Sequence, residues 1–293
     1  MKRMIGLLFA GLACSAAQAQ VKISAIYGGG SSSSATFLSE FQYDFIELKN
    51  NSNSAVTLTG HSLQYRGGTS AAFTGKINLP SITIPANGFF LIRTEPSQSG
   101  TCNAAAPCRP IGTPDFTAST GMGGSGQIQL SGTNGVVALV NTQTLITTPA
   151  CIVGNPAVLD LVGFGNETTG GTTCFEGSGP TGAMGNQFVS VRLLAGCTDT
   201  DNNAADFTIQ SSQFTPRNTA SAPGLHRWLP LDCDNDTLCD RDEINAAGGV
   251  GGIGGTLDCN SNGQLDSCEI TTNPQIDCDG NGQIDARGNR CER

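Results

Sequence analysis

Apolar and polar residues alternate along the first two thirds of the chain. Between Val21 and about Leu194 the apolar positions recur at every second residue. Side chains two residues apart lie on the same face of a strand, so this period predicts β-strands that bury one face. The alternation occurs at Val21, Ile23 and Ala25, and again in the pairs Ile46/Leu48, Val56/Leu58, Ile77/Leu79 and Ile82/Ile84.

Four more continuous apolar runs predict strands near the centre of a sheet, at 89–92, 136–140, 158–164 and 188–194. No part of this region has a sustained helical period. About nine short strands with turns between them predict an all-β sandwich or barrel. The turns are indicated by clusters of Gly, Ser, Asn, Thr and Pro at 28–34, 50–54, 67–70, 85–88 and 121–126.

The net charge of the protein is confined to its last 62 residues. The 293 residues include 15 Lys and Arg and 24 Asp and Glu, a formal net charge of −9. Residues 1–231 hold 11 acidic and 11 basic side chains, whereas residues 232–293 hold 13 acidic and 4 basic. Binding to nucleic acid needs Lys and Arg to displace counterions from phosphates, so no nucleic-acid partner is expected.

The N-terminus has the pattern of a secretory signal peptide. Lys2 and Arg3 precede the apolar run 5–13, and Ala17-Gln18-Ala19 is a small-x-small cleavage site. Cleavage after Ala19 is therefore expected, and no later stretch is long and apolar enough for a transmembrane helix. A lipoprotein signal at Cys14 is the alternative, but Gly11 stands where such a signal needs a larger aliphatic residue.

The acidic tail contains a calcium-loop pattern that begins at Asp258. Oxygen-bearing side chains fall at positions one, three, five, nine and twelve of this unit, with Gly263 at position six and Leu265 at position eight. Ca²⁺ binds six to eight oxygens at about 2.3–2.6 Å, and this spacing is that of the EF-hand loop. The predicted ligands are Asp258, Asn260, Asn262, Gln264 through its backbone, Asp266 and Glu269.

Two further units of the tail repeat the start Asp-Cys-Asp, at Asp232 and Asp277. In the third unit position twelve is Gly288, so the closing carboxylate is displaced to Glu292. Neither a helix before the first loop nor a long one after it is indicated, which favours structural calcium loops over a sensor. The predicted ligands are Asp232, Asp234, Asp236, Leu238 through its backbone, Asp240 and Glu243, and then Asp277, Asp279, Asn281, Gln283, Asp285 and Glu292.

Cysteine spacing agrees with export to an oxidising compartment. Each tail unit holds two cysteines, and pairing within a unit is the simplest expectation. A zinc site is the competing interpretation, but the spacings do not match zinc-ribbon motifs. In the predicted sandwich, Cys102 and Cys108 are placed to close one loop and Cys151 to reach Cys174, which leaves Cys197 over.

Several other patterns carry weaker chemical signals. The glycine-rich segment 121–126 matches a dinucleotide fingerprint on paper, but it precedes a predicted strand at 127–130 and no helix follows. His61 lies in a predicted strand and is interpreted as a packing or edge residue. Asp44 and Glu47 flank Phe45-Ile46 of a predicted strand and are interpreted as residues solvated at a sheet edge. A catalytic pair of carboxylates, as in glycosidases, can be distant in sequence, so glycosidase chemistry stays an open alternative.

Several strand segments occur in an order that is typical of one family. They are 44–50, 55–63, 84–92, 134–140 and 158–164, followed by Ala205-Asp206-Phe207 and Thr215-Pro216-Arg217-Asn218. Together they resemble the lamin-tail domain over about residues 20–220. His61 stands where that family usually has Trp. The resemblance implies an immunoglobulin-like β-sandwich, of a kind that serves as a binding or surface module in exported bacterial proteins.

The tail resembles dockerin-type or thrombospondin-type calcium repeats. The chain is thus expected to comprise a signal peptide (1–19), a lamin-tail-like sandwich (20–220), a linker (221–231) and calcium loops (232–293). We expect a secreted or cell-surface, noncatalytic binding, scaffold or adhesion protein with calcium as its cofactor. Its partner is expected to be an extracellular protein or glycan. The alternatives are a secreted hydrolase or nuclease with a calcium module, and a dockerin-like docking partner.

Overall fold

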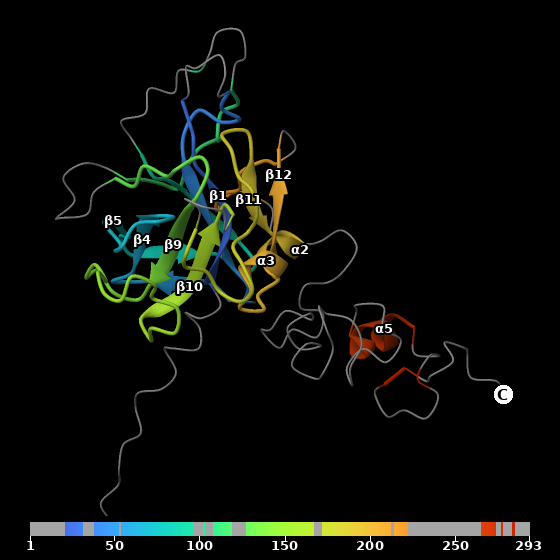
Figure 1. Ribbon diagram of the computed structural model, residues 1–293. Coiled ribbons are helices and arrows are strands. Elements are labelled where there is room, and N and C mark those ends of the chain that lie inside the picture. The colour runs from blue at the N-terminus through green and yellow to red at the C-terminus, as the bar shows by residue number, and fades with distance from the viewer. Residues whose placement is uncertain are drawn as a thin grey trace, which may run out of the picture.

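The computed structural model describes residues 21–31, 38–52, 54–95, 102, 108–118, 127–166, 172–211, 214–221, 265–273, 277 and 283–284. Strands dominate this part of the chain and helices are short, as the alternation predicts (Figure 1). The strands are β1 (Val21–Tyr27), β2 (Phe45–Asn50), β3 (Val56–Leu58), β4 (Ser62–Gly67), β5 (Gly75–Asn78), β6 (Ile82–Ile84), β7 (Phe89–Arg93), β8 (Phe116–Thr117), β9 (Gly135–Val140), β10 (Val158–Phe164), β11 (Val189–Arg192) and β12 (Phe207–Gln210).

Two sheets pack face to face and form an immunoglobulin-like β-sandwich. One has the order β12-β11-β1-β2-β7-β8 and the other β10-β9-β4-β5, while β3 and β6 form a separate pair. The core between the sheets joins Ile46 and Ile92 of the first sheet to Leu139 and Val162 of the second. Burial of this apolar surface is the main favourable contribution to folding. The predicted fold class is confirmed.

Both sheets are also covered on their outer faces. Phe45 and Val189 pack with Phe214 beyond the first sheet, and Ala138 packs with Ile152 beyond the second. All six residues of β2 and of β9 are therefore buried. The prediction that a strand buries only one face is therefore wrong for β2 and β9, because the segments of Phe214 and Ile152 cover the second face of their sheets.

Three local predictions differ from the structure. Segment 127–130 is not a strand, although Ile128 N–H donates to Thr94 O and Leu130 N–H to the Asp44 carboxylate. The apolar run at 188–194 leaves the sheet after Arg192 and continues as the short helix α2 (Leu193–Gly196). A second short helix, α3 (Asn203–Asp206), precedes β12. Helix α2 packs beside β1 and β11, and α3 packs beside β10 (Figure 1). Strands β8 and β12 were not predicted: β8 has only two residues, and β12 is a four-residue strand beyond the region of alternation that ends at about Leu194.

Asp44 and Glu47 are fully buried, so their interpretation as solvated edge residues is wrong. Asp44 accepts the N–H groups of Gly30 and Leu130. Glu47 accepts the Ser24 hydroxyl at 2.6 Å and three bonds from Arg217, the shortest also 2.6 Å. A buried carboxylate needs such partners to offset its desolvation.

A buried ion pair joins the two sheets where two strands are irregular. Arg192 of β11 donates to both oxygens of Asp160 in β10, at 2.8 and 2.9 Å. The second Asp160 oxygen also accepts the N–H of Ile23 in β1 at 2.6 Å. Strand pairing shifts register between Ile23 and Ala25 in β1 and between Val158 and Asp160 in β10. Such bulges re-aim backbone groups, and here they admit a charged link between the sheets.

Disulfides connect Cys102 to Cys108 and Cys151 to Cys174, as the spacing predicts. Cys197 is disulfide-bonded as well, so the prediction that it is the cysteine left over is wrong. Among the residues described, no helix has the length and apolar character needed to cross a membrane.

Replacing Arg192 with Met tests the link between the sheets. The substitution leaves the Asp160 and Asp206 carboxylates buried without their cation, so we expect a loss of about 3–5 kcal/mol in the free energy of unfolding. Urea denaturation of the full chain measures it. Lys76→Met is the control, because Lys76 is partly exposed and its ammonium group donates to a carbonyl oxygen of Gln143 and pairs with no carboxylate in the described structure. Equal losses in the two variants would contradict this account.

Candidate functional site

Most of the predicted calcium ligands lie outside the residues that the structure describes. Their predicted role stays a prediction. The structure describes four ligands, namely Asp266, Glu269, Asp277 and Gln283. Those outside are Asp232, Asp234, Asp236, Leu238, Asp240, Glu243, Asp258, Asn260, Asn262, Gln264, Asp279, Asn281, Asp285 and Glu292.

The described part of the tail brings the second and third units together. Leu265 and Ile284 occupy position eight of these units, and both are buried. The N–H of Ile284 donates to the Asp266 carboxylate at 3.1 Å. Asp266, at position nine, also begins the seven-residue helix α5 (Asp266–Thr272), which includes Glu269 at position twelve. The two units are thus joined by a hydrogen bond next to their buried aliphatic positions, a contact that the spacing alone did not predict.

A second cluster of charged residues lies within the sandwich and was missed by sequence reasoning. One carboxylate oxygen each of Asp160, Glu176 and Asp199 lies within 4.8 Å of the others. Asp160 belongs to β10, whereas Glu176 and Asp199 belong to loops far along the chain. Their sequence separation left no recognisable motif, because only the fold brings them to one place.

Two cations of the chain already bind two of these carboxylates. Besides its bonds to Asp160, Arg192 donates to Asp199 at 3.0 Å and lies 3.7 Å from Asp206. Lys22 Nζ is 2.5 Å from the other Asp199 oxygen and 3.3 Å from the carbonyl oxygen of Leu159. The positions at which a cation would sit against Asp160 and Asp199 are therefore taken by ammonium and guanidinium groups of the protein itself.

Glu176 is the member of the cluster that those cations do not contact. Asn203 holds it in place, because the Asn203 amide oxygen accepts the Glu176 N–H and the Asn203 amide group donates to the Glu176 carboxylate at 3.3 Å. Burial raises the pKa of Glu176 to about 8, and repulsion by Asp160 and Asp199 adds to the shift. At neutral pH this carboxyl group is mostly protonated.

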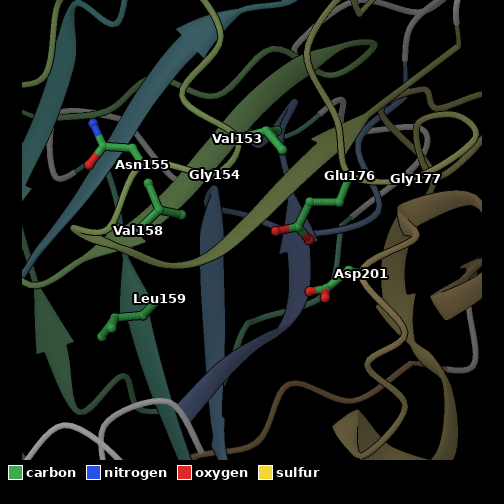
Figure 2. Close-up of a pocket in the computed structure, with 8 residues that line it drawn as sticks. All are labelled: Val153, Gly154, Asn155, Val158, Leu159, Glu176, Gly177 and Asp201. Carbon is green, nitrogen blue, oxygen red and sulfur yellow. The ribbon is translucent and has the colours of Figure 1, made fainter. Parts of the chain in front are cut away.

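Glu176 faces a cavity of about 370 Å³. The carboxyl groups of Glu176 and Asp201 lie on one side and the side chains of Val158 and Leu159 on the other (Figure 2). Val153 is 47% exposed and lies at the rim. The remaining lining residues are Gly154, Asn155 and Gly177.

The two walls of the cavity are fixed relative to each other by covalent and hydrogen bonds. The Cys151–Cys174 disulfide joins the loop of Val153 to the segment of Glu176. Gly177 has φ +72°, and a Cβ there would lie 2.5 Å from the Asn202 side chain, so only glycine allows this close approach. The cavity is thus built by a rigid frame.

Asp201 is held by the loop that precedes α3. It adopts a left-handed conformation with φ 50°. The buried Asp206 carboxylate stabilises this turn, because it accepts the N–H groups of Thr200 and Asn202 and the Thr200 hydroxyl. The same Asp206 lies beside Arg192, so the ion cluster also positions the acidic wall of the cavity.

Residues 15–150 match the family model described as Lamin Tail Domain. This segment includes β1 to β9 and ends before the first residue of the cavity lining, Val153. The match therefore supports the lamin-tail resemblance over the first part of the sandwich and gives no information on the cavity or on the tail.

No curated protein matches the chain. Among solved structures, a DUF4876 family protein from Bacteroides thetaiotaomicron VPI-5482 is similar, with 14% sequence identity and a TM-score of 0.45. The similarity covers 72% of this chain and 75% of that one. At this level of similarity it carries no argument about fold or function.

The raised pKa of Glu176 predicts a pH dependence of stability. Between pH 4.5 and about 8 the unfolded chain loses the Glu176 proton while the folded protein keeps it, so the free energy of unfolding falls as pH rises through this window. We expect Glu176→Gln to remove this part of the decline. The two proteins should differ least near pH 4 and most above pH 8, with the variant the more stable.

Urea denaturation of both proteins at pH values from 4 to 9 measures the difference. Comparison of the two proteins isolates Glu176 from Lys49, whose pKa burial and Arg217 lower to about 7 and which affects both proteins alike. A constant difference between wild type and variant across this range would contradict the assignment.

Proposed function

We propose that this is an exported, noncatalytic binding or scaffold protein whose acidic tail binds calcium. The observation that carries the calcium assignment is the contact between the second and third tail units. Leu265 and Ile284, the position-eight residues of both, are buried, and the Ile284 N–H donates to Asp266. Two loops that are joined by a hydrogen bond to a ligand carboxylate help to hold their oxygen ligands in place, as a calcium site requires.

The residues present fit a hard divalent cation. In the second unit, Asp266 and Glu269 occupy positions nine and twelve, and the helix α5 that carries them begins at position nine of the loop. Oxygen ligands are the class that Ca²⁺ prefers. When bound, Ca²⁺ neutralises carboxylates that otherwise repel one another in a segment with 13 acidic and 4 basic residues.

Export is supported by the signal-peptide pattern of residues 1–19 and by the disulfides of the sandwich, since disulfides persist in oxidising compartments. A binding role is supported by the match of residues 15–150 to the Lamin Tail Domain. His61, one of two histidines, is buried and binds the carbonyl oxygen of Thr59, and burial lowers its pKa. That environment does not suit a general base at a substrate site.

Calcium titration of the full chain tests the proposed role of the tail. We expect saturable heat on adding Ca²⁺, with dissociation constants on the order of 10⁻⁴–10⁻³ M, and slower proteolysis within residues 232–293 at about 10 mM Ca²⁺ than in EDTA. Glu269→Gln is expected to weaken one site by about tenfold, because position twelve closes the loop with both carboxylate oxygens. Asp242→Asn is the matched control, since position eleven supplies no ligand.

Neither heat nor protection on adding Ca²⁺ would overturn the calcium assignment. Equal effects of Glu269→Gln and Asp242→Asn would overturn the assigned loop register.

Replacing Ile284 with Ala tests whether the two tail units act together. The change removes part of a buried side chain whose N–H donates to Asp266 of the second unit, so calcium binding to both units should weaken, although Ile284 supplies no ligand. Val153→Ala is the control, because Val153 is exposed on the sandwich. Calorimetry of the full-length variants measures the effect. Unchanged calcium affinity in Ile284→Ala would show that the contact does not support the sites.

A further inference from the structure

We propose that the cavity lined by Glu176 and Asp201 binds the side chain of a lysine presented by a partner protein. This inference rests on the proposed binding role of the protein and names the chemistry of its partner. It does not depend on calcium binding by the tail. The cavity joins an apolar wall to an acidic one, as an aliphatic stem with a terminal ammonium group requires.

The charges around the cavity favour a cation. Five carboxylates meet there, and the chain supplies only Lys22 and Arg192 against them among the residues described. Arg192 and Lys22 neutralise Asp160 and Asp199, so the two acids that these cations do not contact are Glu176 and Asp201, which line the cavity. The remaining carboxylate, Asp206, is buried beside Arg192.

Lys22 shows that this cluster accepts a lysine ammonium group. Its Nζ lies against Asp199 and the carbonyl oxygen of Leu159, and Leu159 also lines the cavity. A second ammonium group entering from the cavity would meet Glu176 and Asp201. Its methylene groups would lie along Val158 and Leu159, which stand opposite the carboxyl groups (Figure 2).

A divalent metal ion suits the cluster less well than an ammonium group. Both oxygens of Asp160 accept bonds from Arg192, and each oxygen of Asp199 contacts Arg192 or Lys22. A metal ion bound by Asp160, Glu176 and Asp199 would have to displace these cations. An ammonium group at Glu176 and Asp201 leaves them in place.

Affinity for the ammonium group should rise with pH between 6 and 9. The carboxyl group of Glu176 is protonated near neutrality and must ionise to pair with a cation. The charged groups that face it are Asp160, Asp199, Asp201 and Arg192. Because the lysine ammonium keeps its charge over this range, the pH dependence is that of Glu176.

Chemical-shift titration of the full chain tests the proposal. The probe is Nα-acetyl-lysine-N-methylamide, and the matched control is the norleucine derivative, which lacks the ammonium group. We expect saturable shifts at Glu176 and Asp201 with the lysine probe at pH 8.5, with a dissociation constant on the order of 1 mM. The control should cause no saturable shifts there.

Variants of the acidic wall provide the second arm. Glu176→Gln and Asp201→Asn should each weaken the lysine probe by about tenfold at pH 8.5, since each removes one charge-assisted contact. Glu40→Gln is the control, because Glu40 pairs with Arg109 and does not line the cavity. Glu176 is already mostly neutral at pH 7, so Glu176→Gln should fold.

Three outcomes would overturn the proposal. They are equal binding of the lysine and norleucine probes, no saturable shift at Glu176 and Asp201 with the lysine probe, and shifts there caused by MgCl₂ in place of the lysine probe. The last outcome would make the cluster a metal site. None of them affects the calcium titration of the tail, so failure here and failure of the calcium assignment are distinguishable.

Discussion

The buried guanidinium of Arg192 is the group on which the sandwich and its cavity both depend. It lies between the two sheets with its side chain fully buried, and it binds Asp160, Asp199 and the carbonyl oxygens of Ile23 and Thr198. Burial alone would lower its pKa, but Asp160, Asp199 and Asp206 raise it, so the group stays charged. A buried charge is tolerated only with such partners, and satisfying Arg192 therefore gathers carboxylates at one place in the fold.

Gathering these carboxylates has a consequence beyond stability. Arg192 and Lys22 neutralise those that they contact, while Glu176 and Asp201 lie at the edge of the cluster beside a cavity. In our proposals the tail also has clustered carboxylates that need cations, but the cations come from solution. Its clustered carboxylates have few cations of the chain nearby, so Ca²⁺ supplies the charge that Arg192 and Lys22 supply in the sandwich.

The sequence predicted the fold better than the site. Alternation of apolar residues depends on neighbouring positions, so it located β1, β2, β3, β5 and β6, and the continuous apolar runs located β7, β9 and β10. Strand β12 was missed, because its alternation covers only four residues. Asp44 and Glu47 were misread, because burial of a charge depends on partners that lie far along the chain, such as Arg217 for Glu47.

The cavity was beyond the reach of sequence patterns for the same reason. Glu176, Asp201 and Val153 come from three loops, and a disulfide and the Asn203 side chain place them. The calcium loops have the opposite character. The predicted ligands of a loop fall within about twelve residues of one another, so the spacing alone is enough to predict them. The hydrogen bond of Ile284 to Asp266 joins two separate units and was seen only in the structure.

The ¹³C resonance of the Glu176 carboxyl group, followed over pH in the full chain, reports the pKa of that group. This titration tests most directly whether acidic groups that the cations of the chain do not contact line the cavity. The account predicts a midpoint near pH 8, which falls when the lysine probe is present. A midpoint near 4.5 that the probe does not move would contradict it.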